Sequence, residues 1–201
     1  MEKKFYGQAE YAKGLEDVIV AESSIGYVDG QKGWLVYRGI EIQELAEKSN
    51  FEETTYLLLY GKLPTATELG EFKEKLKARR EIPDQVYEVI KATPPTCHPM
   101  GALRTAVSFL GCLDPRAEDS SLDYYHEVGL NLISQMATIA AAIQRHRQGK
   151  DFVKPDSALD HTENFLFMCT GEKPEPLATK VMDISMILHA DHEMNASTFT
   201  C

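Results

Sequence analysis

The chain has 201 residues, of which 43% are hydrophobic and 26% are charged, a composition typical of a folded globular protein and not of a disordered one. Its formal net charge of −10 argues against nucleic acid as the main partner, because phosphate binding needs a basic surface. The sequence begins without a secretory leader and contains no run of about 18 apolar residues, so we expect a cytoplasmic protein that does not span a membrane.

A β-hairpin is predicted within residues 18–40, the one stretch rich in β-branched and aromatic residues. The turn formers Asp29-Gly30 and Gly33 stand between two short apolar runs, which is the pattern of two antiparallel strands joined by a tight turn. The predicted strands contain Tyr27 and Val28 before the turn, and Trp34, Val36 and Tyr37 after it.

Helices are predicted for the rest of the chain, from apolar residues at steps of three and four and from stop signals at Gly and Pro. A capping box at Thr65 or Thr67 starts one of them, and Pro99 fits the first turn of another. The predicted helical segments are 40–50, 51–64, 65–83, 84–93, 98–113, 122–150, 157–171 and 178–200, with loops at 114–121 and 150–157. The fold class is therefore mainly α with a small N-terminal hairpin, in one domain.

The basic run 73–80, "KEKLKARR", is predicted to be the solvated face of a helix whose other face carries Phe72, Leu76 and Ala78. A patch for an anion or a partner is the alternative.

The four cysteines are far apart and form no CxxC pair, so we expect reduced thiols and no structural zinc. Three of them, Cys97, Cys112 and Cys169, stand among apolar residues and are predicted to fill the core, and the fourth is Cys201.

The densest group of reactive side chains lies near the end of the chain, in "LHADHEMNASTFTC". The stripe Val181, Ile184 and Leu188, extended at the same steps, reaches His192 and Asn195, so both are predicted to face inward. Buried polar side chains cost free energy unless they form hydrogen bonds or serve a function. These two satisfy each other or a backbone carbonyl, or they serve a functional site.

Two other kinds of chemistry are not expected here. His189 and His192 with Glu193 read HxxHE, whereas zinc proteases carry HExxH or HxxEH, so no metal is predicted. No GxSxG elbow occurs that would present a nucleophilic serine. A metal hydrolase built on the two histidines remains a minor alternative.

The segment "LHADHEMNASTF" (188–199) resembles the citrate synthase family, including the 2-methylcitrate synthases of the short bacterial and archaeal type. The similarity extends upstream through residues 14–64, "HPMGALRTAVSFLG" (98–111) and "ENFLFMCTG" (163–171), so it covers essentially the whole chain.

The resemblance implies an acyltransferase of the tricarboxylic acid cycle type that condenses acetyl-CoA, or propionyl-CoA, with oxaloacetate to give citrate, or 2-methylcitrate, and CoA. By position, His192 resembles an oxaloacetate-binding histidine, and Asn195 and Ser197 resemble residues that orient the enol-forming histidine by hydrogen bonds. No cofactor is implied beyond the acyl-CoA co-substrate. The family is typically homodimeric, with segments 99–113 and 122–147 as plausible contributors.

The sequence differs from the family because it has no segments similar to those that carry the other catalytic residues. It holds no GPxHGGA-like or GxGHxxY-like segment and no later catalytic aspartate segment, and His98 is expected only to cap or pack a helix. We therefore expect residues 1–201 to be the N-terminal part of a large helical domain, truncated, exposing apolar helix faces and inactive alone. A non-catalytic half-protein that acts as a structural or regulatory subunit is the alternative.

Overall fold

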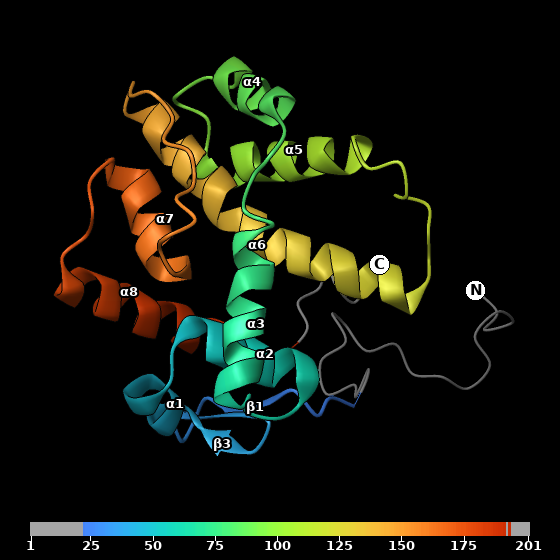
Figure 1. The fold of residues 1–201 in the computed structure, drawn as a ribbon, viewed down its shortest axis with the longest axis vertical. Helices are drawn as coiled ribbons and strands as arrows, with labels where there is room; N and C mark the ends of the chain where they lie inside the picture. The colour runs from blue at the N-terminus through green and yellow to red at the C-terminus, as the bar shows by residue number, and fades with distance from the viewer. Residues whose placement is uncertain (1–21, 192, 194–201) are drawn as a thin grey trace, which may run out of the picture.

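The computed structural model describes residues 22–191 and residue 193, and within them it confirms a mainly α fold with a small sheet (Figure 1). The strands are β1 (Gly26–Asp29), β2 (Trp34–Tyr37) and β3 (Ile40–Glu41). The helices are α1 (Ile42–Lys48), α2 (Phe51–Tyr60), α3 (Ala66–Lys77), α4 (Asp84–Ala92), α5 (Pro99–Cys112), α6 (Leu122–Arg147), α7 (His161–Thr170) and α8 (Pro176–Leu188).

The predicted hairpin is confirmed. β1 and β2 pair antiparallel, with Tyr27 opposite Val36, and the turn between them passes through Gly33 at φ 64°. Strand β3 was not predicted; it pairs with the other side of β2 and leads directly into α1. As a result β2 is the central strand of the sheet, and its last residue, Tyr37, is fully buried.

The predicted helix boundaries are confirmed where capping residues set them. The capping box of α3 forms between Thr65 and Glu68. Gly61 ends α2 in the left-handed conformation, at φ 76°. His98 caps α5 as expected, because its Nδ1 accepts a hydrogen bond from the N–H of Met100 at 3.2 Å, and Pro99 takes the first helical position.

The core is built around α6, which contacts α3, α4, α5 and α7 (Figure 1). Its C-terminal half joins the largest apolar cluster, together with α4 and α5. The small residues Ala137 and Ala141 let α7 approach closely, and Met168 of α7 is fully buried against them. A separate cluster joins the sheet to α1, α2 and α8.

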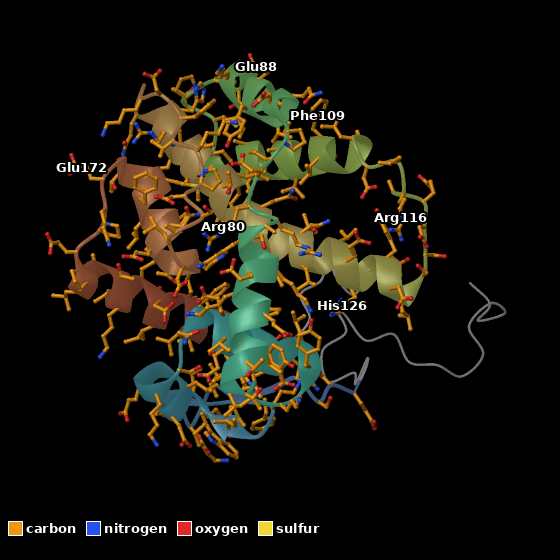
Figure 2. All side chains as sticks on the ribbon, viewed as in Figure 1. Arg80, Glu88, Phe109, Arg116, His126 and Glu172 are labelled. Atoms are coloured by element: carbon orange, nitrogen blue, oxygen red, sulfur yellow. The ribbon has the colours of Figure 1, made fainter. Side chains whose placement is uncertain are left out.

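The basic run 73–80 is not simply a solvated face. Arg80 is 2% exposed and lies in the interior (Figure 2), where its Nη1 donates to the carbonyls of Leu159 at 2.6 Å and Asp156 at 3.1 Å. Lys73 and Lys77 both reach Asp160. The prediction was wrong for these residues because distant loop carbonyls and a carboxylate, which sequence periodicity does not reveal, fold against α3.

Of the three cysteines predicted to fill the core, only Cys169 packs against a core cluster, the one around Met168. Cys112 is exposed, and Cys97 and Cys169 are only partly buried. The prediction was wrong for Cys112 because α5 turns the face that carries it outward and packs on its neighbours through Ala102 and Ala106. Cys201 lies outside the described residues.

The last helix is shorter than predicted, and it faces a different way. α8 ends at Leu188 instead of continuing to residue 200, and Val181 and Leu188 are 60% and 42% exposed. Ile187 is the fully buried residue of α8, packed in the cluster around Tyr37. The inward prediction was wrong for Val181 and Leu188, because α8 packs through Ile187 on the cluster that joins the sheet, α1 and α2. Ile184 is partly buried, and the extension of the stripe to His192 and Asn195 lies outside the described residues. Within the described ranges no helix combines the length and the apolar character needed to cross a bilayer.

Candidate functional site

The motif from residue 188 onward begins where α8 ends. The structure describes it as far as Asp191 and again at Glu193, so the predicted site residues His192, Asn195 and Ser197 lie outside the described residues. Their predicted roles therefore stay predictions. The described part shows how the chain is held directly before and after position 192.

Tyr37 holds the backbone of Asp191. The Tyr37 hydroxyl donates to the Asp191 carbonyl at 2.9 Å and accepts from the Asp191 N–H at 3.1 Å. The Leu188 carbonyl, at 3.4 Å, is a second and longer acceptor. A tyrosine hydroxyl is protonated at neutral pH and can donate, and burial raises the pKa of Tyr37 further above its ordinary value of 10.0.

The Asp191 side chain lies against Gly26 of β1. A Cβ placed on Gly26 would stand 2.5 Å from Asp191 Oδ2, closer than two such atoms can approach. The same oxygen accepts from the N–H of Glu193 at 3.4 Å, and Glu193 has φ 70°. The carboxylate of Asp191 therefore closes a turn across residue 192.

The sheet that holds Asp191 is itself tied to α2. Arg38 follows Tyr37 and donates through Nη2 to the Leu58 carbonyl at 2.8 Å. It also donates through Nη1 to the Ser24 hydroxyl at 2.7 Å. Arg38 has φ 49°, which is unusual for a residue with a side chain, and Gly39 follows at φ 86°. This tight corner fixes the sheet between α2 and the end of α8.

A cavity of about 240 Å³ opens beside the end of α8. It is lined mainly by apolar side chains of α2 and by the segment that leads to residue 192. Its lining residues are Ile25, Phe51, Thr55, Leu58, Leu59, Ile133, Ala190 and Asp191.

His189 does not join a metal cluster in the described part of the chain. Its Nδ1 lies 2.7 Å from the Ser185 carbonyl of its own helix, and its side chain is exposed. No three His, Cys, Asp or Glu side chains gather around one point among residues 22–191 and 193. His192 lies outside that search, so the expected absence of a metal stays a prediction.

A buried polar cluster between α2, α3 and α7 was not predicted from the sequence. Glu52 Oε1 accepts from the N–H of His161 at 2.8 Å, and Lys73 Nζ pairs with Asp160 at 2.6 Å. The signal in the sequence was weak, because Glu52 and Asp160 resemble ordinary acidic residues at helix starts.

Burial sets the charge state of this cluster. It raises the pKa of Glu52 and lowers the pKa of His161 to about 4, so the imidazole is neutral. Burial would also raise the pKa of Asp160, but the ammonium groups of Lys73 and Lys77 hold it below its ordinary value. The cluster joins α2, α3 and α7, and none of these residues lines the cavity beside α8, which indicates a structural role.

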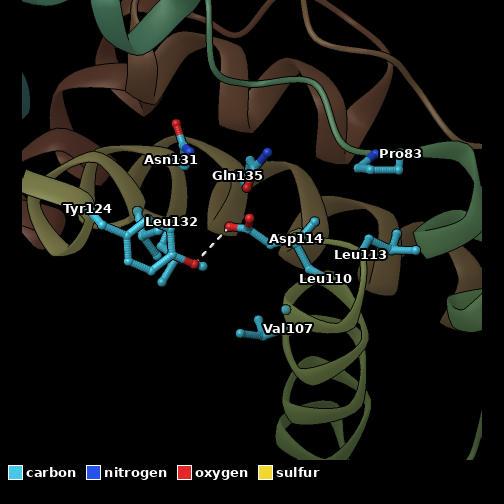
Figure 3. A pocket seen from close by; sticks show the side chains of 11 residues that line it. Pro83, Val107, Leu110, Leu113, Asp114, Tyr124, Asn131, Leu132 and Gln135 are labelled. Atoms are coloured by element: carbon cyan, nitrogen blue, oxygen red, sulfur yellow. Dashed lines mark hydrogen bonds between the residues drawn. The ribbon is translucent and has the colours of Figure 1, made fainter. Parts of the chain in front are cut away.

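A second cavity, of about 380 Å³, lies between α5 and α6 (Figure 3). The hydroxyl of Tyr124 donates to Asp114 at 2.9 Å at its rim. Its remaining lining is mostly apolar and includes Val107, Leu110 and Leu132. It shares no lining residue with the cavity beside α8.

Sequence comparisons identify the family. The family model described as "Citrate synthase, C-terminal domain" matches residues 14–201. The citrate synthase of Deinococcus radiodurans is 51% identical over 189 residues, which cover 94% of this chain and 50% of the relative. The 2-methylcitrate synthase of Mycobacterium tuberculosis is 38% identical, covering 93% of this chain and 47% of the relative. The chain thus spans about half the length of these curated relatives.

Solved structures of citrate synthases have the same fold as this chain. The citrate synthase of Thermoplasma acidophilum, solved as a ternary complex with carboxymethyl coenzyme A and oxaloacetate, superposes with a TM-score of 0.88 at 31% identity. It matches 94% of this chain and 49% of that structure. The enzyme of Pyrobaculum aerophilum gives 0.85 at 40% identity, matching 92% of this chain and 48% of its own. The predicted fold class is confirmed, and the chain belongs to the citrate synthase family.

Proposed function

We propose that residues 1–201 form the N-terminal part of the large helical domain of a cytoplasmic citrate synthase-type acyltransferase. In the proposed reaction a carbon–carbon bond forms between the acyl carbon next to the thioester of acetyl-CoA, or propionyl-CoA, and the keto carbon of oxaloacetate. Water then cleaves the thioester and releases CoA, so no cofactor is needed. The observation that carries the proposal is the match along 94% of this chain to a citrate synthase at 51% identity.

His192 is proposed to bind oxaloacetate. An imidazole N–H is a suitable donor to a dicarboxylate, and hydrogen bonds that involve a charged acceptor are the strong ones. Asn195 and Ser197 are proposed to orient the enol-forming histidine of the complete enzyme. The cavity beside Asp191 supports this proposal, since it lies next to the segment that leads to His192.

The 201-residue chain alone is proposed to be inactive. It spans about half of its relatives, and it holds no segment similar to those that carry the enol-forming pair. Removing members of a catalytic unit commonly costs several orders of magnitude in rate.

Complementation tests this function. Residues 1–201 are co-expressed with, or fused to, the part of the Deinococcus radiodurans relative that the match does not cover, and release of the CoA thiol is followed with oxaloacetate and acetyl-CoA or propionyl-CoA. We expect activity only in the assembly. His192→Ala should raise the KM for oxaloacetate more than the KM for the acyl-CoA. His189→Ala is the matched control, since that ring bonds its own helix.

The outcomes separate two functions. Activity with an oxaloacetate-specific effect of His192→Ala supports the enzyme. A stable complex without any activity supports the non-catalytic subunit, which the half-length span also favours.

A homodimer is proposed for the complete protein. Large apolar side chains of α5 and α6 are exposed, including Met100 at 62%, Leu122 at 83% and Tyr125 at 56%. Sedimentation of the assembly gives its mass, and a monomer would contradict the proposal.

A further inference from the structure

The residue before position 192 is held unusually firmly for a residue just past a helix. The backbone groups that follow a helix end usually bond to water, and such segments fray. Here the N–H and the carbonyl of Asp191 both bond to one buried hydroxyl, that of Tyr37, at 3.1 Å and 2.9 Å. These contacts join positions 154 residues apart in the sequence.

The anchor itself is rigid. Tyr37 is 0% exposed and packs among Leu45, Leu57 and Ile187. It ends the central strand of the sheet, and its neighbour Arg38 ties that corner to α2. Because the Tyr37 side chain is held by this packing, its hydroxyl can hold the backbone of Asp191 in one place.

Gly26 is needed for space. Its φ is not among the positive values of this chain, so backbone freedom does not explain a glycine there. A side chain would meet Asp191 Oδ2 at 2.5 Å. That oxygen accepts from the Glu193 N–H at 3.4 Å, which bridges the residue between them. The missing side chain of Gly26 therefore leaves room for the carboxylate that closes the turn.

We propose that Tyr37 and Gly26 are positioning residues for the oxaloacetate side of the site: the sheet holds the backbone and the carboxylate of Asp191, the residue directly before His192. This inference rests on the proposed function. Neither Tyr37 nor Gly26 touches the substrate in it; both act through Asp191. In this proposal the N-terminal sheet contributes to substrate binding without touching the substrate.

Hydrogen exchange tests the anchoring in the 201-residue chain, whatever the chain does. Tyr37→Phe keeps the ring and removes the hydroxyl, and Tyr27→Phe, at a tyrosine that is 50% exposed in the same sheet, is the control. We expect the Asp191 amide to exchange about five- to tenfold faster in Tyr37→Phe, the loss of one or two ordinary hydrogen bonds, with α6 unchanged. Unchanged exchange at Asp191 overturns the anchoring.

Gly26→Ala gives an independent test of the same turn. Its matched control is Gly30→Ala, because nothing lies within 4 Å of a Cβ at Gly30. Gly26→Ala should speed exchange at Glu193, and Gly30→Ala should not. Equal exchange in the two variants overturns the role of Gly26.

Kinetics of the complemented assembly test the positioning. Tyr37→Phe and Gly26→Ala should raise the KM for oxaloacetate about tenfold, the loss of roughly one well-oriented bond, and leave the KM for the acyl-CoA within about twofold. A variant that merely unfolds lowers activity without this split. Faster exchange at Asp191 with an unchanged oxaloacetate KM overturns the positioning role. An assembly of unmodified sequence that shows no activity contradicts the proposed function instead, and the exchange result then still decides the anchoring.

Discussion

The carboxylate of Glu52, in the first turn of α2, accepts a hydrogen bond from the backbone N–H of His161, the first residue of α7, at 2.8 Å. Both side chains are 3% exposed. Burial penalises the charged form of each, which raises the pKa of one and lowers the pKa of the other. Folding therefore favours a neutral state at both positions, with opposite consequences for stability against pH.

His161 should make the fold less stable as the pH falls. Its pKa is about 4 in the fold against 6.5 ordinarily, so between these values the unfolded chain binds a proton that the folded chain does not. This should cost about 2 kcal/mol at pH 5 relative to pH 7. His161→Phe keeps the stacking on Phe51, whose ring centroid is 4.6 Å away, and removes this cost. Urea unfolding at pH 5 and pH 7 measures this difference in the free energy of unfolding. An equal loss of stability between the two pH values in His161→Phe and in the parent would show that His161 is not the cause.

Glu52 should act in the opposite direction. The pKa of Glu52 is 4.5 ordinarily and higher in the fold, so between these two values the folded chain binds a proton that the unfolded chain does not. The free energy of unfolding should therefore fall as the pH rises from 4.5 through the folded pKa. Glu52→Gln keeps an oxygen for the His161 N–H and should be at least as stable as the parent at pH 7. Glu52→Ala leaves that N–H unpaired and should lose about 1–3 kcal/mol. Urea unfolding at pH 7 compares them, and a Gln variant weaker than the Ala variant would contradict this account.

Arg80 should be a strong stability determinant. Its guanidinium donates to the Leu159 and Asp156 carbonyls, and its own carbonyl accepts from the Thr138 hydroxyl at 2.8 Å. Arg80→Ala leaves these loop carbonyls without their charged donor and should destabilise by about 3 kcal/mol. The neighbouring Arg79→Ala should stay within about 0.5 kcal/mol, since Arg79 only reaches a carbonyl of its own helix. Denaturation midpoints of the two variants give the difference, and similar midpoints would disprove it.

His98 should matter for the helix and not for the substrate. His98→Ala removes the cap of α5 and should cost about 1 kcal/mol, and His98→Asn should recover most of it. Thermal unfolding measures both variants. Neither should change the oxaloacetate KM of the complemented assembly, and a change there would mean that His98 contributes to the site.

The parts of the fold that short-range chemistry controls could be predicted from the sequence. The hairpin follows from the turn residues around Gly30, and α3 follows from Thr65 and Glu68, because both signals act within a few residues. The resemblance of segment 188–199 to the citrate synthase family is confirmed by the family model and the relatives.

The remaining features depend on contacts between distant segments. The burial of Arg80 depends on loop carbonyls from residues 156 and 159, and the turn of Val181 toward solvent depends on where the sheet packs. The role of Tyr37 depends on a partner at residue 191. Helical periodicity describes one segment at a time, so it identifies a helix without showing which side its neighbours cover.

Helix α6 determines which parts of the molecule can open alone. Its residues belong to three apolar clusters: Ile139 packs with α4 and α5, Ala137 with α7, and Leu130 with α3. Loss of α6 removes one wall from all three, so these clusters should unfold as one cooperative unit. The cluster around Tyr37 has no member from α6 among its described residues. The sheet and the end of α8 therefore form a second packing unit, whose slow hydrogen exchange should be lost in a step distinct from the unfolding of the three clusters around α6.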